Sequence, residues 1–429
     1  MATNSVDLKS ELTSANSIVT EDTALTEKPS TVKCQYYLPQ KKRMCRMLAI
    51  HNAQFCGLHL ALSGGDINLD YKRIPCPLDP KHTVYPANLD KHILKCNARP
   101  KPHPIYYVDG VNSGLTGTVP CPEDTCNLAA FPEDYILKLI HRVEIAYESF
   151  VKSINDCYIT HLSMKAELTD SKNGETARKH LLQQASIIGY IHKTLTCYTD
   201  VTFIEFGAGR GKLSHWVQRS LPESAVNPEF IVVDRAACRY KYDSYHKSDG
   251  PIFHRLFIDI EHLYLSKVDG ITPERSIVGY CKHLCGAATD LALSCLMNTL
   301  SAPKRPIIVM ATCCHHQCTW PAYVGRKFFE MQLKFNSIDF HAISLLSSWK
   351  VCGMKQDSNS EILNCDPSLL SLRDLPAPYK EDIGYKCKRL IDMGRVWWLR
   401  ENGMNTDILA YVPQNVTVEN IVIIATPNI

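Results

Sequence analysis

A glycine-rich turn directly after an apolar segment constrains this chain more than any other feature of its sequence. Residues 201–206 are mostly apolar, a pattern that predicts a buried β-strand, and Glu205 is the one acid among them. Four small residues follow in the order Gly207, Ala208, Gly209 and, after one arginine, Gly211. Glycine allows the backbone to turn tightly and lets a ligand approach it closely. The sequence therefore predicts a strand that ends in a ligand-binding turn.

Further apolar segments continue this pattern along the chain. Strands are expected at 230–234, 255–259, 276–281 and 306–311, and two closing strands at 408–412 and 421–425. Helical patterns separate the first five, which indicates parallel strands with a ligand at their carboxyl ends. Asp234 and Asp259 end two of these segments, where one acid could bind a ribose and the other could lie beside an adenine. Each could instead be an ordinary exposed residue at a strand end.

The strand, the acid and the G-x-G-x-G spacing together resemble motif I of the Rossmann-like S-adenosylmethionine (AdoMet)-dependent methyltransferases. The spacing is tighter than the G-x-G-x-x-G of dinucleotide-binding folds. The resemblance implies an α/β fold of class I, with a seven-stranded mixed sheet over residues 170–429, and AdoMet as the cofactor. The residues that it assigns to cofactor binding are Glu205, Gly207, Ala208, Gly209, Gly211, Asp234 and Asp259.

Composition limits the setting in which the protein works. The chain has 429 residues, of which 45% are hydrophobic, and it holds no apolar run of membrane-spanning length, so no membrane partner is expected. Its 19 cysteines are odd in number and spread over the whole chain, which favours a reducing intracellular compartment over a disulfide framework. Residues 1–30 are rich in Ser, Thr and acids and are expected to be a disordered tail.

Two sets of cysteine and histidine have spacings typical of structural zinc sites. The first is C-x10-C-x10-C-x2-H, formed by Cys34, Cys45, Cys56 and His59. The second is C-x5-H-x9-H-x3-C, formed by Cys76, His82, His92 and Cys96. We expect a CCCH-type finger over 31–62 and a CHHC-type finger over 72–100, each folded around one Zn²⁺, because modules this small cannot build a stable core alone. The alternative is a scatter of unrelated thiols and imidazoles.

Basic charge is concentrated in the same region. Residues 33–101 contain twelve Lys and Arg against four Asp, a net charge of +8, although the whole chain carries only +3. Zinc bound to two or three thiolates changes this by about one unit at most. Basic charge beside metal modules and aromatic residues favours RNA contact over a merely solvated face, although charge alone does not separate RNA from DNA. Cys121 and Cys126 follow and are expected to be free thiols in a loop, with a third metal site as the alternative.

Residues 130–165 are expected to form a helical link that packs on the enzyme domain, because apolar residues recur at helical spacing from Ile136 to Ile154. Further helices are expected at 180–195 and 385–401. Residues 353–380 are rich in Ser, Pro and Asp and are expected to be a long insertion.

Chemically reactive residues follow the fourth and fifth expected strands. Lys282 and His283 follow the fourth, in the loop that faces the cofactor methyl group in this fold. The fifth leads into Cys313, Cys314, His315, His316 and Cys318. Five donors within six residues cannot all reach one tetrahedral ion, so we expect a substrate loop with His315 or His316 near a ribose or phosphate, and structural zinc as the alternative.

Two smaller sets of residues complete the site predictions. Cys281 and Cys285 are expected to be buried, reduced thiols. Four basic residues near the carboxyl end are expected to contact phosphates, with a solvated helix face as the alternative: Lys386, Lys388, Arg389 and Arg395.

The order of these motifs makes the resemblance specific. Two zinc modules, Glu-Phe-Gly-Ala-Gly-Arg-Gly, Lys-His-Leu-Cys-Gly, Cys-Cys-His-His and Cys-Lys-Arg-Leu-Ile-Asp-Met-Gly-Arg occur in the same order in the eukaryotic tRNA 2′-O-methyltransferases that modify the fourth nucleotide of the acceptor stem. The resemblance covers residues 33–425. It implies AdoMet as methyl donor, the tRNA acceptor stem as substrate and a ribose 2′-hydroxyl as acceptor, with no obligate protein partner evident. The second module also resembles the CHHC finger of a minor-spliceosome RNA-binding protein.

The catalytic residue is left open between two neighbours. A ribose hydroxyl must be oriented and must lose its proton before it attacks a methyl group. Lys282 is favoured for this role and His283 is the alternative. As chain neighbours they are expected to point apart, so that only one faces the methyl group. A different class of function, a zinc-finger RNA-binding protein with a non-catalytic methyltransferase scaffold, is disfavoured by the intact glycines and acids.

Overall fold

The computed structural model describes residues 32–50, 53–62, 73–99, 102–114, 127–151, 153–238, 241–246, 253–298, 305–350 and 371–428. Its contacts divide the chain into two compact units, Met1–Pro102 and His103–Ile429. The expected tail at 1–30, the thiols Cys121 and Cys126, and the 353–370 part of the expected insertion lie outside the described residues. No helix in the described ranges is both long enough and apolar enough to cross a membrane.

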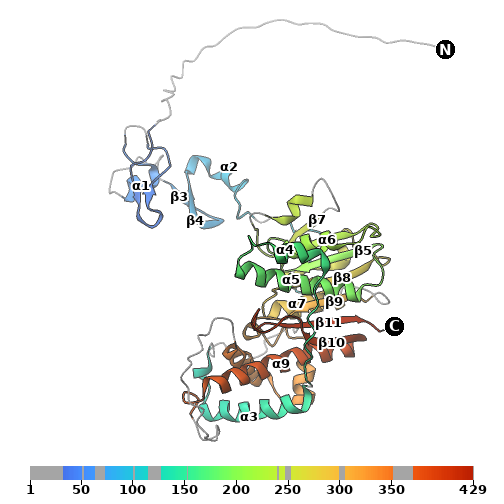
Figure 1. The fold of residues 1–429 in the computed structure, drawn as a ribbon. Coiled ribbons are helices and arrows are strands. Elements are labelled where there is room, and N and C mark those ends of the chain that lie inside the picture. The colour runs from blue at the N-terminus through green and yellow to red at the C-terminus, as the bar shows by residue number, and fades with distance from the viewer. Residues whose placement is uncertain are drawn as a thin grey trace, which may run out of the picture. The chain divides into compact units, whose positions relative to one another are not determined.

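The first unit contains two small modules of the same plan, each with a two-stranded antiparallel ribbon and a short helix (Figure 1). In one, β1 (Tyr37–Leu38) pairs with β2 (Arg43–Met44) and α1 (Gly57–Leu62) follows. In the other, β3 (Ile74–Cys76) pairs with β4 (Asp79–Val84) and α2 (Leu89–Ile93) follows. The buried cluster of the first module is made of its three cysteines, so its core consists largely of groups that can bind metal.

The second unit is built around one seven-stranded sheet with the strand order β10-β11-β9-β8-β5-β6-β7. The parallel strands are β5 (Val201–Phe206), β6 (Glu229–Asp234), β7 (Phe253–Phe257), β8 (Ser276–Cys281) and β9 (Ile307–Ala311). β10 (Met404–Ala410) and β11 (Ile421–Pro427) close the sheet antiparallel. The predicted seven-stranded mixed sheet is confirmed.

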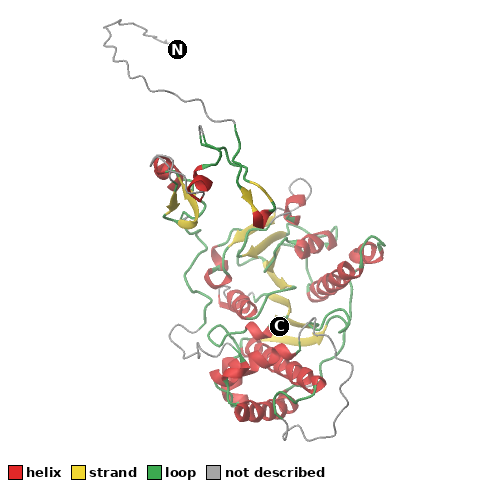
Figure 2. Cartoon of the chain, turned by 90° about the vertical axis from the view of Figure 1, so that its left-hand side faces the viewer, coloured by secondary structure: helices red, strands yellow, loops and turns green. Residues whose placement is uncertain are grey.

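Both faces of this sheet are covered by helices, as Figure 2 shows with the strands in the middle layer. Side chains alternate between the faces along each strand. Phe203 and Tyr280 pack toward α5 (Glu175–Thr194) and α6 (Lys212–Ser220). Ile204 and Met310 pack toward α7 (Ala287–Asn298) and α9 (Ala377–Glu401).

A second apolar cluster forms on the other side of α9, where α3 (Glu133–Phe150) and α8 (Ser337–Leu346) pack against it. Ile136 and Val143 of α3 are completely buried there. The expected packing of this helix on the enzyme domain is therefore confirmed, and α3 belongs to the same compact unit as the sheet. The helix ends at Phe150, so Ile154 does not continue its stripe. α9 also begins earlier than the expected 385, since Pro378 is compatible with a first helical turn.

Candidate cofactor and catalytic site

The strand order places the topological switch point of the sheet at the carboxyl end of β5. Its neighbours are β6 on one side and β8 on the other, so the chain turns in opposite directions from this strand. Ligands of open α/β sheets bind where the strand order reverses, outside the carboxyl ends of the strands. The glycine turn after β5 and the loops after β6, β8 and β9 all leave the sheet at this edge.

The glycine turn leaves backbone open to a ligand. Gly207, Gly209 and Gly211 all have positive φ, at 63°, 50° and 74°, a conformation that side chains with a Cβ rarely adopt. A Cβ on Gly209 would meet nothing within 4 Å. A Cβ on Gly207 would lie 3.0 Å from Leu284 Cδ1 and 3.1 Å from the His283 carbonyl oxygen. The turn is therefore closed against the loop after β8 at Gly207 and open at Gly209, with the buried Ala208 between them.

Glu205 stabilises this turn through hydrogen bonds to α6. It is 5% exposed, and its Oε2 accepts hydrogen bonds from the Ser214 backbone N at 2.9 Å and from Ser214 Oγ at 2.5 Å. Burial raises the pKa of Glu205 to about 7. The side chain thus ties β5 to the first turns of α6 and holds the two ends of the glycine turn together.

The other two acids occupy different positions at the edge. Asp234 Oδ2 accepts a hydrogen bond from Gly209 N at 2.7 Å, and its Oδ1 accepts one from Ala236 N at 2.9 Å. Asp259 lies two residues beyond the end of β7, where it caps a short 3₁₀ helix through Glu261 N at 3.2 Å. Each carboxylate oxygen has a second lone pair, so Asp234, beside the open backbone of Gly209, fits the ribose hydroxyls of a nucleoside cofactor.

Lys282 follows β8 and is directed at His180 of α5, with Nζ 3.0 Å from His180 Nδ1. Desolvation and the positive charge of Lys212 lower the pKa of Lys282 to about 8, while Glu205 opposes the shift. Desolvation and the nearby lysines also lower the pKa of His180, which keeps its ring neutral and able to accept the hydrogen bond. His180 lies 102 residues from Lys282 along the chain, so no local sequence pattern predicts this contact.

His283 lies close to the same histidine, with a distance of 6.4 Å between the two ring centroids. Its side chain is exposed. Desolvation and the charge of Lys282 lower the pKa of His283 to about 4, so the ring is neutral near pH 7. The sequence predicts that Lys282 and His283 point apart, but both side chains approach His180, and either could lie near a substrate.

His315 belongs to a buried network. It has no exposed surface, and its Nε2 lies 2.9 Å from Asp392 Oδ1. Although burial opposes ionisation, His315, Arg389 and Arg395 hold the pKa of Asp392 below its usual range. His316 is half-buried, and its Nδ1 is a buried atom without a hydrogen-bond partner in the described structure. A contact between His315 and a substrate stays a prediction, and it would require the residues that cover this ring to move.

The expected phosphate contacts on α9 are wrong for three of the four basic residues to which they were assigned. Lys388, Arg389 and Arg395 are 1%, 2% and 0% exposed. They pair with acids that the fold brings to them, namely Glu419 at 2.6 Å, Asp392 at 2.9 Å and Asp290 at 2.6 Å. Lys386, the fourth, lies 2.7 Å from Asp382. Buried charges must be paired, so Lys388, Arg389 and Arg395 are held in internal ion pairs and cannot reach RNA.

The two thiols after β8 differ from each other. Cys281 is completely buried, as expected. Cys285 is exposed, contrary to the prediction, because it lies in the loop beyond the end of the strand.

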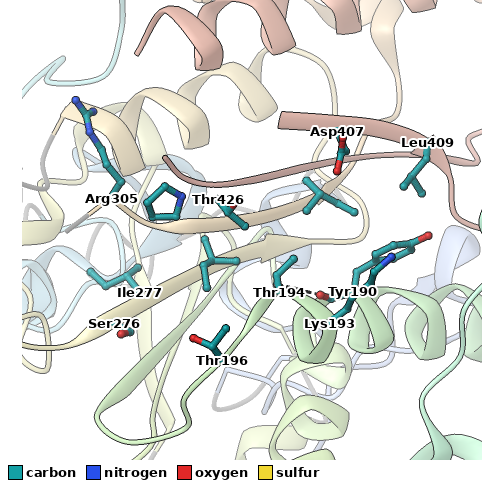
Figure 3. A pocket seen from close by; sticks show the side chains of 13 residues that line it. Tyr190, Lys193, Thr194, Thr196, Ser276, Ile277, Arg305, Asp407, Leu409 and Thr426 are labelled. Carbon is teal, nitrogen blue, oxygen red and sulfur yellow. Dashed lines mark hydrogen bonds between the residues drawn. The ribbon is translucent and has the colours of Figure 1, made fainter. Parts of the chain in front are cut away.

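A pocket of about 550 Å³ lies at the opposite edge of the sheet. Figure 3 shows Tyr190 and Lys193 of α5 and Asp407 of β10 among its lining residues. Ser276 and Ile307, the first residues of two parallel strands, also line it. It therefore lies at the amino ends of the strands, away from the glycine turn, and is not the cofactor site.

The first finger brings its four predicted ligands together. One donor atom from each of Cys34, Cys45, Cys56 and His59 lies within 4.8 Å of all the others. His59 Nδ1 is 3.3 Å from Cys34 Sγ and 3.4 Å from Cys56 Sγ. Tetrahedral zinc with ordinary bond lengths requires donor atoms roughly 3.3–3.8 Å apart, so the set fits one Zn²⁺.

The ligand set of the second finger fits a Zn²⁺ ion of its own. Cys76, His82, His92 and Cys96 meet the same 4.8 Å limit. The two sulfur atoms are 3.8 Å apart, and His92 Nε2 is 3.2 Å from Cys76 Sγ. His82 turns its other nitrogen toward Asp79, with Nδ1 3.4 Å from Oδ2. Such an outer carboxylate orients a metal-binding histidine.

The mixed seven-stranded sheet, the open glycine turn and the acid beside it define a class I AdoMet-dependent methyltransferase, and the two metal modules add zinc fingers to it. The comparisons with known sequences are more specific. A family model described as "Methyltransferase TRM13" matches residues 182–426. One described as "CCCH zinc finger in TRM13 protein" matches residues 32–60, and one described as "U11-48K-like CHHC zinc finger" matches residues 73–97. The chain belongs to the TRM13 methyltransferase family.

Curated relatives match along almost the whole chain. The human "tRNA:m(4)X modification enzyme TRM13 homolog" is 36% identical, over 93% of this chain and 95% of that protein. The Saccharomyces cerevisiae "tRNA:m(4)X modification enzyme TRM13" is 29% identical, over 92% of this chain and 96% of that protein. Among solved structures, the SAH-bound Podospora anserina methyltransferase PaMTH1 is 12% identical with a TM-score of 0.29, over 73% of this chain and 100% of that chain, a likeness too weak to support an argument.

Proposed function

We propose that this protein transfers a methyl group from AdoMet to the ribose 2′-hydroxyl of the fourth nucleotide in the tRNA acceptor stem. The observation that carries the proposal is the similarity of 36% over 93% of the chain to a protein named as a tRNA:m(4)X modification enzyme. The ribose and the acceptor stem rest on the family resemblance of the motifs. An intact glycine turn, Asp234 and Lys282 support activity rather than a scaffold without catalysis.

When bound, AdoMet supplies the methyl group on a cationic sulfonium. The tasks left to the protein are to align the ribose hydroxyl and to accept its proton. We assign the second task to Lys282, because a pKa of about 8 leaves part of the population neutral near pH 7. His180 Nδ1 accepts a hydrogen bond from Lys282 Nζ at 3.0 Å and so fixes the direction of the amine. The lone pair of the neutral Lys282 amine is then free to take the proton from the 2′-hydroxyl oxygen.

The fingers are assigned to tRNA binding. Residues 33–101 carry a net charge of +8, enough for several phosphate contacts that weaken as salt is added. We also propose that the protein works in a reducing intracellular compartment. The free thiols found throughout the described residues, including the exposed Cys197, support this.

The test is methyl transfer from labelled AdoMet into unmodified tRNA, with wild type, Gly209→Arg and Lys282→Ala compared. We expect label in the ribose of an acceptor-stem nucleotide with wild type and in neither variant. Retained activity in Lys282→Ala would move the proton-accepting role to His283 or to the His315–His316 loop. Label in a base would refute the 2′-hydroxyl as acceptor.

The remaining outcome concerns the substrate itself. Absence of label with folded, zinc-loaded wild type would refute tRNA as substrate and would favour the non-catalytic RNA-binding alternative. Binding of AdoMet, measured by calorimetry on the same sample, shows whether the cofactor site is intact in that case.

A further inference from the structure

Three cysteines outside the fingers converge at the carboxyl edge of the sheet. The sulfur atoms of Cys285, Cys313 and Cys314 all lie within 4.8 Å of one another, the same limit that the ligand sets of the two fingers meet. Cys285 comes from the loop between β8 and α7, and the other two follow β9. Neither finger nor the cofactor turn uses them, so the cluster requires its own explanation.

The backbone holds these thiols together. Cys285 and Cys313 form a parallel β-bridge, and Gly286 N lies 3.4 Å from the Cys313 carbonyl oxygen. A Cβ on Gly286 would come within 2.5 Å of the Gln317 backbone, so the two loops are in direct contact there. The convergence is therefore built into the loops and does not depend on a chance choice of side-chain rotamer.

Cys314 adds local backbone strain to the cluster. Its φ of 50° and ψ of 43° are left-handed, a conformation that is unfavourable for a residue other than glycine. Such strain persists where the surrounding structure or a ligand requires it. Here the strained residue contributes the third sulfur of the cluster.

The chemistry of three adjacent thiols favours a soft metal ion. One disulfide would leave the third thiol unused, whereas three thiolates can all bind one Zn²⁺. No fourth Cys, His, Asp or Glu of the described residues joins the set within that distance. Three protein ligands and an open fourth position are typical of zinc sites that accept water or substrate. Cys285 is exposed, so an ion can reach the cluster from solvent.

We propose that Cys285, Cys313 and Cys314 bind a third Zn²⁺ ion, with its fourth position open. The ion would join the loops after β8 and β9, and Cys285 lies only three residues beyond Lys282. Zinc binding would therefore fix the conformation of the loop that carries Lys282. The proposal does not depend on tRNA being the substrate, because metal binding is measured without RNA.

The test is the zinc content of the purified full-length protein after dialysis against trace Zn²⁺, measured by mass spectrometry of the metal. We expect three ions per chain in wild type and two in Cys285→Ser, Cys313→Ser and Cys314→Ser. Cys197→Ser, which removes an exposed thiol elsewhere, is the matched control and keeps three. Cys76→Ser removes a finger ligand and should also leave two ions per chain. The double variant Cys76→Ser/Cys285→Ser should retain only one ion per chain.

Folding is checked separately in every variant by AdoMet binding and far-ultraviolet circular dichroism. Cys285→Ser is the decisive variant, because an exposed side chain is the least disruptive to replace. Two ions per chain in folded wild type would overturn the proposal. So would three ions in Cys285→Ser, or a disulfide within the cluster in the intact mass of wild type after alkylation.

Discussion

Replacing Lys282 with arginine separates proton acceptance from charge and hydrogen bonding. Arginine keeps a cation beside His180 but does not lose its proton at any working pH. Desolvation lowers the pKa of Lys282 to about 8 from 10.5. At pH 7 roughly 9% of the amine is then neutral, against about 0.03% for an ordinary lysine, a gain of roughly 300-fold in competent protein. If Lys282 is the base, Lys282→Arg should lower the rate of methyl transfer about 100-fold or more.

The wild-type rate should follow the neutral fraction of Lys282. We expect it to rise nearly tenfold between pH 6 and 7 and to level off above about pH 8. Lys282→Arg should show no such rise. Lys212→Met removes a cation that lowers the pKa of Lys282, so the midpoint should move to higher pH. Single-turnover rates with saturating AdoMet and tRNA isolate the chemical step from product release.

A specific result would refute this reasoning. A wild-type rate that is flat from pH 6 to 9, with activity retained in Lys282→Arg, would exclude Lys282 as the proton acceptor. Loss of that flat activity in His283→Ala would assign the role to His283, whose ring, with a pKa near 4, is already neutral across this range.

Further predictions concern stability, cofactor binding and zinc. Burial raises the pKa of Glu205 to about 7 from 4.5, so the folded state holds a proton that the unfolded state releases in this pH range. Between pH 5 and 8, measured by urea unfolding, the free energy of unfolding of wild type should therefore fall by about 2.5 kcal/mol relative to Glu205→Gln. Arg395→Met should cost about 3–5 kcal/mol in the same assay because the buried Asp290 loses its cation, although Asp392 keeps Arg389. Lys138→Met, in an exposed pair, should change the free energy of unfolding very little. Asp234→Asn should weaken AdoMet binding at least tenfold by calorimetry, and the melting temperature should fall modestly because the amide nitrogen cannot accept the second backbone hydrogen bond. Chelation of finger zinc should abolish tRNA binding, measured by filter retention, and leave AdoMet binding intact.

The sheet could be predicted closely because its signals are local. β5 and β8 match the expected 201–206 and 276–281 at both ends, since each is a mostly apolar segment followed directly by glycine or a charged residue. β7 ends two residues before the expected 259, because Asp259 caps the next turn instead of continuing the strand. Both zinc modules were predictable for the same reason, since their ligand spacing is visible along the chain.

The catalytic half of the site was less accessible from sequence because its contacts are long-range. His180 meets Lys282 only because α5 packs across the sheet. The basic residues of α9 suggested an RNA-binding face, yet Asp392 stands three residues from both Arg389 and Arg395, and that spacing is typical of pairing within one helix. Charge counts alone cannot show that such residues are buried.

The position of Arg395 explains why α9 carries so much buried charge. Its guanidinium lies 2.6 Å from Asp290 of α7, 3.4 Å from the carbonyl oxygen of Gly286 and 3.2 Å from Cys318 Sγ. Gly286 belongs to the loop after β8 and Cys318 to the loop after β9, so the buried Arg395 side chain contacts both loops. An apolar residue could fill the same volume but could not bond a carbonyl group, a thiol and two acids at once. We infer that this network is retained despite its desolvation cost because it fixes the two loops that carry Lys282 and the three-cysteine cluster.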